Sequence, residues 1–460
     1  MTFWGDAITH ARTAARLELG DLSNLADLTA ARLDALERGA EPTTQELDAI
    51  ATVFGIELSE LAGAEIDGAP ATLLFRAWPE VQGDLSLFGA QNARTLGTFL
   101  RCVRRLDTLE PSRSSLGALG VSPELAAAAT ATERGAELAA RVRQSLGLAE
   151  AEAIPSMLQL CGQLGVAVFG LLEEDDPLPG IDAACTLLPQ PAVLLNLSGY
   201  RGSWWRVRMT LAHELAHLLF DHVGPHGLTL PYLVSPQRRS SALLEGIERR
   251  ANAFAASFLA PPAGVRTCVQ PLDDPTCEEA ISRIIHTFGV GRSVAVNRIT
   301  DVVLEAKDSR RESMERRASH RPMPDWGSDT YPTHHCGLPG GPLRASVLRR
   351  FEEGTMGALR ARELLDLEPT DWLPEGAGLS HERRQPLLSR RDVVSRLATQ
   401  LLRRAGYGLR TVPTDVERVG DLRRVTVAEW TDDGHQRVCG ELILDDGLDL
   451  IETVLPLTRR

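Results

Sequence analysis

The chain of 460 residues is 43% hydrophobic and 24% charged, a composition typical of soluble globular proteins and sufficient for about two to four domains. It has no apolar run near the about 18 residues of a membrane span, no N-terminal signal peptide and no C-x-x-C pair among its seven cysteines, so we expect a soluble cytoplasmic protein without a disulfide scaffold. The net charge of −13 disfavours indiscriminate binding to nucleic acid or to anionic membranes.

The N-terminal region, 1–68, is predicted to be a domain of several short helices. One helix ends at Glu37-Arg38-Gly39, and a second is predicted over 44–54. The stretches LTAARLDALERG and LDAIATVFGIELSEL resemble the repressor-type helix-turn-helix domain. However, this region carries 13 acidic side chains against four arginines. Because duplex affinity comes largely from neutralising phosphates, we expect a degenerate module for protein contact or dimerisation rather than DNA binding.

Residues 69–132 carry weaker signals, and we interpret them as a helical connector with a helix around 93–106. A better-patterned domain is predicted over 133–304. It begins with two amphipathic helices and continues with three short apolar segments, which Pro and Gly separate, so that a small sheet precedes a long helix. The predicted helices cover 135–146 and 154–164, and the predicted strands cover 166–172, 183–188 and 192–197.

The long helix, WRVRMTLAHELAHLLFD over 205–221, contains an H-E-x-x-H sequence. Four helical residues turn by about 40° more than one full turn, so His213 and His217 lie on one face and can bind one divalent ion. Glu214 projects beside them, within reach of a water on that ion. The helix is otherwise almost entirely apolar, which predicts burial. The alternative is a buried helix whose two histidines bond to backbone carbonyls.

A catalytic zinc usually takes three protein ligands, and the third is expected on the next predicted helix, over 242–259. Glu248 is our first candidate, because Asn252 follows it by one helical turn and could hold a ligand histidine through its second ring nitrogen. Glu245 is the rival, about 60° away around the same helix.

Further polar residues follow the H-E-x-x-H helix. We expect His222 to be structural or part of a loop, because it lies close to the opposite helical face from His213. His226 stands beyond a Gly-Pro break and could reach the cleft. Three residues of the predicted loop over 223–241 are candidates to stabilise an oxyanion: His226, Tyr232 and Arg238.

Residues 305–342 are charged and then rich in Pro, Gly and His, and we interpret them as a linker. Within them, His334-His335-Cys336 has ligand chemistry but no partner pair at metal spacing, so loop residues are expected there. The chain from 343 to 460 is predicted to be a small accessory α+β unit. Its predicted elements are helices over 343–367 and 389–404 and a hairpin of 425–430 with 437–444.

The segments RVRMTLAHELAHLLFDH and IERRANAFAASFLAPP resemble the ImmA/IrrE family of metallopeptidases. Family members carry R-x-R-F-T-L-A-H-E-L-x-H and then E-x-x-A-N-x-F-A-A-x-L-L-M-P. The departures, such as Met209 where Phe is usual, touch no ligand position. The resemblance implies a mostly helical α+β fold with a zincin-like core. In that core, a small sheet, the H-E-x-x-H helix and a glutamate helix are flanked by a helical N-terminal domain and a small α+β C-terminal unit.

The resemblance also implies a site and a function. It implies one Zn²⁺ ion on His213, His217 and Glu248, with Asn252 supporting a ligand histidine and Glu214 as general base. It implies an endopeptidase that cuts a helix-turn-helix transcriptional repressor in a stress, mobile-element or phage-defence response. The alternative is a DNA-binding regulator whose zinc domain is structural or sensing. No membrane partner is expected, and a homo-oligomer is compatible with the sequence.

Overall fold

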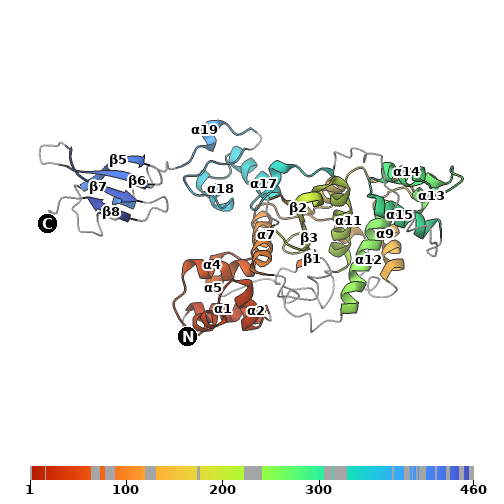
Figure 1. Ribbon diagram of the computed structural model, residues 1–460, viewed down its shortest axis with the longest axis horizontal. Coiled ribbons are helices and arrows are strands. Elements are labelled where there is room, and N and C mark those ends of the chain that lie inside the picture. The colour runs from red at the N-terminus through yellow and green to blue at the C-terminus, as the bar shows by residue number, and fades with distance from the viewer. Residues whose placement is uncertain are drawn as a thin grey trace. The chain divides into compact units, whose positions relative to one another are not determined.

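Figure 1 shows the computed structural model of the chain, which divides into two units, Met1–Ser346 and Val347–Arg460. It is a mostly helical α+β structure with two small sheets, as predicted. Among the described residues, no helix combines the length and the hydropathy needed to cross a bilayer. The structure describes residues 3–15, 17–63, 73–77, 89–119, 131–173, 177–221, 241–304, 314, 329–375, 378–387, 394–395, 397–399, 402, 411–419, 422–430, 436–444 and 450–454.

Five short helices form the N-terminal part, where short helices are predicted. The predicted helix over 44–54 is present, and a capping box starts it. The Thr43 hydroxyl accepts a hydrogen bond from the Glu46 N–H, and the Glu46 carboxylate accepts one from the Thr43 N–H. The five helices are α1 (Phe3–Ala14), α2 (Leu19–Leu25), α3 (Ala30–Glu37), α4 (Thr44–Val53) and α5 (Leu58–Gly63).

Arginines of this part are paired with its own carboxylates. The Arg12 Nε lies 2.7 Å from a Glu37 oxygen, and the Arg32 Nε lies 2.6 Å from a Glu46 oxygen. The hydrogen bond from Arg32 lowers the pKa of Glu46 to about 2. These guanidinium groups therefore already have anionic partners within the fold.

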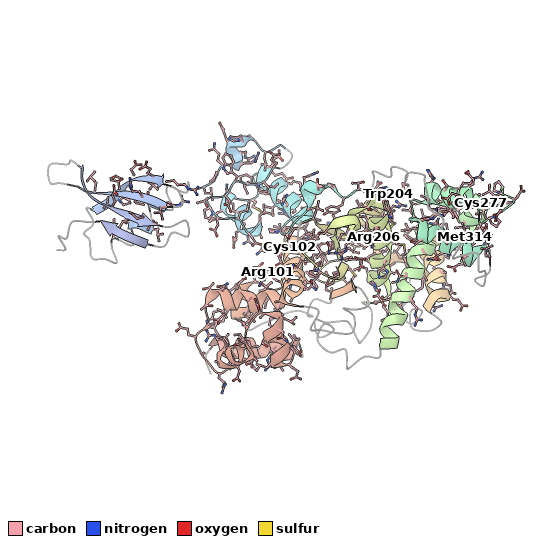
Figure 2. The ribbon with its side chains drawn as sticks, in the orientation of Figure 1. Arg101, Cys102, Trp204, Arg206, Cys277 and Met314 are labelled. Carbon is pink, nitrogen blue, oxygen red and sulfur yellow. The ribbon has the colours of Figure 1, made fainter. Side chains whose placement is uncertain are left out.

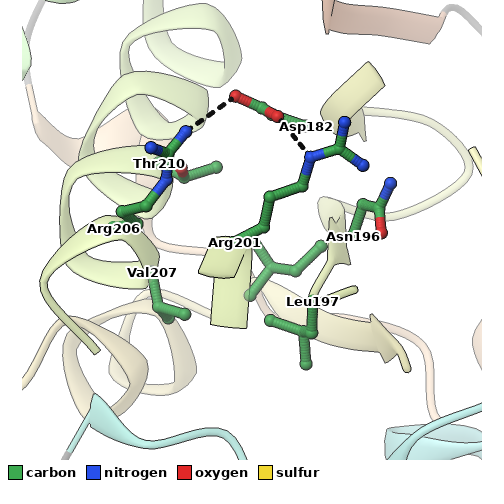
Figure 3. Close-up of a pocket in the computed structure, with 8 residues that line it drawn as sticks. Asp182, Asn196, Leu197, Arg201, Arg206, Val207 and Thr210 are labelled. Atoms are coloured by element: carbon green, nitrogen blue, oxygen red, sulfur yellow. Dashed lines mark ion pairs between the residues drawn. The ribbon is translucent and has the colours of Figure 1, made fainter. Parts of the chain in front are cut away.

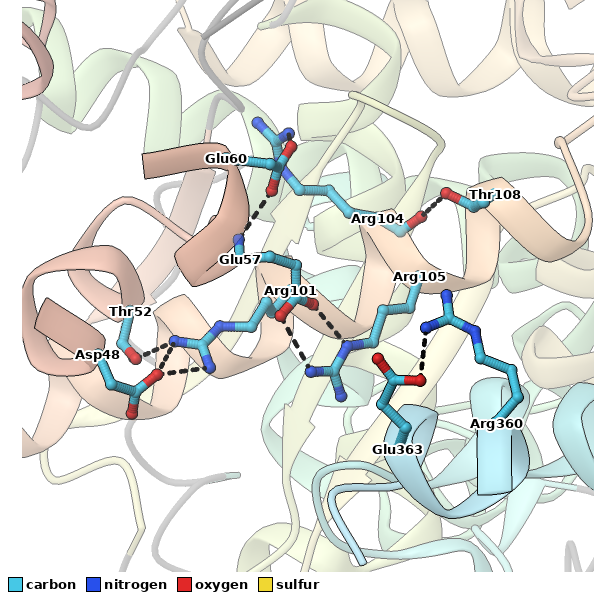
Figure 4. A network of polar contacts seen from close by, with 10 residues as sticks. All are labelled: Asp48, Thr52, Glu57, Glu60, Arg101, Arg104, Arg105, Thr108, Arg360 and Glu363. Atoms are coloured by element: carbon cyan, nitrogen blue, oxygen red, sulfur yellow. Dashed lines mark hydrogen bonds and ion pairs between the residues drawn. The ribbon is translucent and has the colours of Figure 1, made fainter. Parts of the chain in front are cut away.

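Helix α7 (Gly89–Leu109) packs against α2 and α4. At Gly97, an added Cβ would lie 1.8 Å from the carbonyl oxygen of Thr52, so only glycine permits this approach. Three arginines of α7 form ion pairs with acidic residues of the N-terminal part (Figure 4): Arg101 with Asp48, Arg104 with Glu60 and Arg105 with Glu57. The connector therefore neutralises part of the acidic surface of the N-terminal helices.

The first sheet has four strands in the order β1-β3-β4-β2. Strands β2 and β4 run parallel, whereas β3 is antiparallel to both β4 and β1. Strand β4 is buried along its whole length, which explains why AVLLN shows no polar alternation. Three strands lie where strands are predicted, but no strand is predicted at β1. The strands are β1 (Leu73–Ala77), β2 (Ala167–Leu171), β3 (Ile181–Thr186) and β4 (Ala192–Asn196).

Two long helices follow one another outward from this sheet (Figure 1). Helix α11 (Trp204–Phe220) packs against β1, β3 and β4, and α12 (Ser241–Leu259) packs against α11 and α9 (Ala131–Ser145). In this core Phe254 stacks on Phe258 at 5.2 Å between ring centroids and meets Phe220 edge-on at 5.5 Å. The other helices of the unit are η2 (Leu116–Leu119), α10 (Met157–Gln163), η3 (Gly199–Gly202), α13 (Pro262–Val269), α14 (Glu278–Phe288), α15 (Arg292–Val302) and η7 (Thr333–His335).

A fully buried ion pair anchors α11. Arg208 pairs with Asp329, and neither side chain is exposed to solvent. The guanidinium also donates to four backbone carbonyl oxygens, those of Ile154, Pro155, Phe288 and Gly289. The Asp329 carboxylate accepts further hydrogen bonds at the start of α10, from the Ser156 hydroxyl and the N–H groups of Met157 and Leu158. This pair therefore connects α11 with α10 and with the end of α14.

Asp329→Asn is expected to lower the free energy of unfolding by about 3–5 kcal/mol, because Arg208 would remain buried without its counter-charge. Urea unfolding followed by circular dichroism measures this change. Asp273→Asn, at an exposed position, is the matched control and should change stability by less than about 0.5 kcal/mol. Equal stability of the two variants would contradict the structural importance of the pair.

The segment that follows Asp329 lies along the outer edge of β2. The Tyr331 hydroxyl donates to the carbonyl oxygen of Val168, and the Gly337 N–H donates to that of Gly170. The Tyr331 side chain is buried, and burial raises its pKa above the ordinary range. This part of the predicted linker therefore packs on the sheet.

The second unit contains an antiparallel sheet in the order β5-β6-β7-β8. The predicted hairpin is present as β6 paired with β7. The region predicted as one helix over 343–367 instead forms two helices, because Gly354 adopts a φ of +76° that interrupts it. The elements are α17 (Gly341–Glu352), which begins in the first unit, α18 (Ala358–Leu364), α19 (His381–Arg384), β5 (Thr411–Val419), β6 (Leu422–Trp430), β7 (Gln436–Leu444) and β8 (Leu450–Val454).

Part of the predicted helix over 389–404 is described, and its apolar residues pack on this sheet. The buried cluster contains Val394, Ala398, Leu402, Val425, Val427, Leu442 and Leu444. The three helical members follow one another at intervals of four residues, so they lie along one face. The second unit therefore has a small hydrophobic core of its own.

Candidate metal centre

Helix α11 presents His213 and His217 on one face, as their spacing predicts. Figure 2 labels Trp204 and Arg206 at the start of this helix. Both histidine side chains are buried, and their Nε2 atoms lie 2.9 Å apart. Two ring nitrogens that face each other so closely need a proton or a cation between them, because two lone pairs repel. The pair is therefore arranged to share one positive ligand.

Glu248 of α12 supplies a third group. Its Oε2 lies 3.2 Å from His213 Nε2, and its Oε1 lies 3.5 Å from His217 Nε2. Zinc bonds of about 2.0–2.1 Å at tetrahedral angles place ligand atoms about 3.3 Å apart, so these groups fit a zinc ion. Among the residues that the structure describes, no other group of three His, Cys, Asp or Glu side chains could hold a metal. The side chain of Glu245, the rival candidate, lies outside the described residues.

The second nitrogen of each ring also has a partner. His213 Nδ1 lies 3.2 Å from Asn252 Oδ1, and His217 Nδ1 lies 2.7 Å from Asp221 Oδ2. Asp221 in turn forms an ion pair with Arg250. An oxygen that accepts a hydrogen bond from Nδ1–H leaves the Nε2 lone pair available for a metal. Both imidazoles are therefore oriented to bind through Nε2.

Asp221 is the residue of this site that sequence analysis did not single out. It follows His217 by four residues, the same helical spacing that relates the two histidines. This spacing from His217 is the sequence signal that could have identified Asp221. Four residues considered from the sequence lie outside the described residues: His222, His226, Tyr232 and Arg238.

Asp221→Asn is expected to weaken zinc binding by about 10–100-fold, the usual cost of losing a carboxylate that supports a ligand histidine. The neutral amide accepts the His217 Nδ1–H bond more weakly than the carboxylate does. Titration of the metal-free protein against a chromophoric chelator measures the dissociation constant. An unchanged constant, matching that of the control Asp301→Asn on α15, would remove Asp221 from the site.

Electrostatics link the ligand groups in the absence of a metal. Burial raises the pKa of Glu248, but the charge of His217 and hydrogen bonds to both histidines outweigh burial, and the net pKa is lowered. Burial lowers the pKa of His217, yet Glu248 and Asp221 raise it well above its ordinary value. A metal that binds these groups would therefore compete with a proton on His217.

Residues 205–300, which contain all of these groups, match the family model Peptidase_M78, the IrrE N-terminal-like domain. This segment belongs to the ImmA/IrrE family. The predicted resemblance is confirmed here, and the family supports a metallopeptidase-type function. The match does not extend to the helix-turn-helix-like N-terminal region. No curated protein and no solved structure was found to match the chain.

Glu214 is the fourth polar group in the IrrE N-terminal-like domain's site. It is fully buried, and among the described residues no N–H or O–H group donates to either carboxylate oxygen. Glu214 interacts with the Cys185 thiol of β3. Burial raises the pKa of this thiol, and the charge of Glu214 and a hydrogen bond with it raise the pKa further. Burial of a carboxylate without an N–H or O–H donor is costly, so this group is typical of a functional rather than a structural position.

The His334-His335-Cys336 sequence lies apart from the IrrE N-terminal-like segment. The two histidine rings contact each other at 4.3 Å between centroids, and the Cys336 thiol donates to the carbonyl oxygen of Pro332. Among the described residues they belong to no group of three potential ligands. The prediction that they are loop residues is wrong for the two histidines, which belong to the short 3-10 helix η7, and Cys336 follows that helix.

Proposed function

We propose that the chain is a zinc-dependent endopeptidase. The observation that carries this proposal is the convergence of His213, His217 and Glu248, with the buried carboxylate of Glu214 next to His213 on the same helix. A purely structural zinc site needs no general base and is usually closed by a fourth protein ligand. The group formed by the described residues contains three ligand side chains, the number that a catalytic zinc usually takes from the protein.

The chemistry follows from the placement of these side chains. A zinc ion held by the three ligands supplies a Lewis acid that polarises the scissile carbonyl and acidifies water. Glu214 accepts a proton from the attacking water as the new C–O bond forms. It then delivers that proton to the leaving nitrogen as the C–N bond breaks, giving a carboxylic acid and an amine. Asn252 and Asp221 keep the two rings in position throughout.

We propose a helix-turn-helix transcriptional repressor as the substrate, in a stress, mobile-element or phage-defence response. Similarity to the ImmA/IrrE family motivates this choice. The N-terminal helices would then contact a protein rather than DNA, because Arg12 and Arg32 are already engaged by Glu37 and Glu46. A surface that neutralises phosphates needs free cations.

The test is to incubate the purified protein with repressors encoded beside its gene, with zinc and with zinc plus a chelator. Mass spectrometry of the products identifies any cleavage site. We expect one repressor to be cut at a defined bond, and the chelator to stop the reaction. Cleavage of unrelated proteins but of no repressor would contradict the substrate class, and the absence of any cleavage by zinc-loaded protein would contradict the peptidase.

A further inference from the structure

Strand β1 closes the outer edge of β3 and runs antiparallel to it (Figure 1). Leu74 is paired with Cys185, and Phe75 with Ala184. In the chain, β1 stands between the N-terminal helices and α7, far before the segment 205–300 that matches the family. The edge of the sheet beside the metal helix is therefore occupied by a strand from another part of the chain.

Strand β3 packs against α11, the helix that carries His213 and His217. Toward the start of β3, Asp182 lies 3.0 Å from Arg201 and 3.7 Å from Arg206 of α11 (Figure 3). Thr210, which precedes His213 by three residues, lines the same small pocket. The start of β3 is thus level with the first two turns of α11.

The other end of β3 reaches the general base. Cys185, the next-to-last residue of the strand, is fully buried, and α11, the helix that carries Glu214, packs against both β3 and β1. Position 74 of β1 is directly opposite Cys185. A chain on the outer edge of β3 therefore passes beside the residue that would accept the catalytic proton.

An open sheet edge binds extended peptides because its unpaired N–H and C=O groups bond to any backbone that aligns with them. A substrate segment antiparallel to β3 would take the position that residues 73–77 fill. We propose that residues 73–77 are an intramolecular blocking strand, which must leave β3 before a substrate segment can bind there. This inference rests on the proposed peptidase function.

The exchange of the two strands is balanced in backbone hydrogen bonds but not in chain entropy. Strand β1 and an incoming peptide would form the same kind of backbone hydrogen bonds with β3, so bonds lost by one are remade by the other. Because β1 is part of the same chain, its effective concentration at the edge of β3 is in the mM range. A free peptide of equal affinity would have to be present above that concentration to displace it. The blocked form is therefore favoured until a partner displaces β1 or a tightly binding substrate competes with it.

The first experiment measures peptide binding without catalysis, in zinc-loaded full-length protein carrying Glu214→Gln. The probe is a fluorescent peptide with the sequence of residues 71–79, followed by anisotropy. The test variant adds Leu74→Pro and Phe75→Pro. In an antiparallel pair only one of two consecutive residues donates its backbone N–H to the neighbouring strand, so prolines at both positions ensure that one hydrogen bond to β3 is lost. The matched control adds alanine at both positions, which preserves the backbone donors.

We expect the proline variant to bind the probe at least about 10-fold more tightly than the alanine control, because the tethered competitor has been removed. Equal binding by two folded variants would overturn the proposal. Circular dichroism establishes whether the proline variant is folded.

A second variant gives a result even if the proline variant does not fold. Phe75→Cys with Ala184→Cys joins directly opposed residues, which are close enough for a disulfide, on the face of the sheet away from Cys185. Oxidation should abolish probe binding and reduction should restore it, whereas Phe75→Cys alone should not respond. Binding that is unchanged by oxidation would overturn the proposal.

Hydrogen exchange in the unmodified protein provides a third measurement. The amides of 73–77 should exchange through local opening well before those of β4, and equal protection of the two strands would also overturn the proposal. None of these measurements requires hydrolysis. If the proline variant with Glu214 restored binds the probe but cuts no repressor, the peptidase is refuted and the blocking strand is left intact.

Discussion

Glu214→Gln is expected to reduce peptide hydrolysis by about 10²–10⁴-fold or more while leaving zinc bound. The glutamine keeps the size of the side chain but cannot accept the proton of the attacking water. The three ligand groups belong to other residues, so metal content should remain unchanged. The measurements are kcat on a cleavable repressor and the zinc content of the same preparation by mass spectrometry.

The matched control is Glu137→Gln on α9, the same substitution at a half-exposed side chain. It should retain both activity and zinc. Full activity in Glu214→Gln would mean that another group acts as the base. Loss of zinc in that variant would instead show that Glu214 supports the metal, which the described contacts of the ligand groups do not indicate.

Glu248→Ala is expected to cause the largest loss of metal affinity, greater than the about 10–100-fold that loss of a supporting residue costs. Only two imidazoles would remain, and the negative charge that balances the cation would be gone. Equilibrium dialysis measures the dissociation constant. A thermal melt gives a second readout, because zinc should raise the Tm of the unmodified protein but not of this variant.

Glu245→Ala is the informative comparison, since this residue stands three positions earlier on the same helix. It should bind zinc as the unmodified protein does. If Glu245→Ala lost the metal and Glu248→Ala retained it, the third ligand would be Glu245, and the helix α12 would have to be rotated from the orientation found here.

The part of the site that could be predicted from the sequence depends on the spacing of residues within single helices. An α-helix repeats closely enough that residues four apart share a face, so His213 with His217 could be placed together without knowledge of the fold. The same spacing related Glu248 to Asn252, although the choice over Glu245 also depended on the family resemblance. In the structure, Asn252 contacts His213 and Glu248 lies near both rings.

Contacts between distant segments were not predictable in this way. Strand β1 has only five residues, and its partner β3 lies more than a hundred positions later in the chain. No periodic pattern in the sequence therefore predicts that the two strands pair. The same is true of Asp329, which contacts Arg208 across 121 positions from a stretch that reads as a linker. In the second unit, the hairpin partners β6 and β7 are adjacent in sequence and were predicted, whereas β5 and β8 were not.

The bond between Arg208 and Asp329 has a consequence for the order of events during biosynthesis. The ribosome must add 121 residues after Arg208 before the matching carboxylate exists. Until then the Arg208 guanidinium has no carboxylate with which to form a buried ion pair. Because Arg208 lies five residues before His213 on α11, this part of the helix cannot pack into the core before Asp329 is present. Acquisition of the metal is therefore expected late in synthesis, after Asp329 has emerged, rather than when the histidines first leave the exit tunnel.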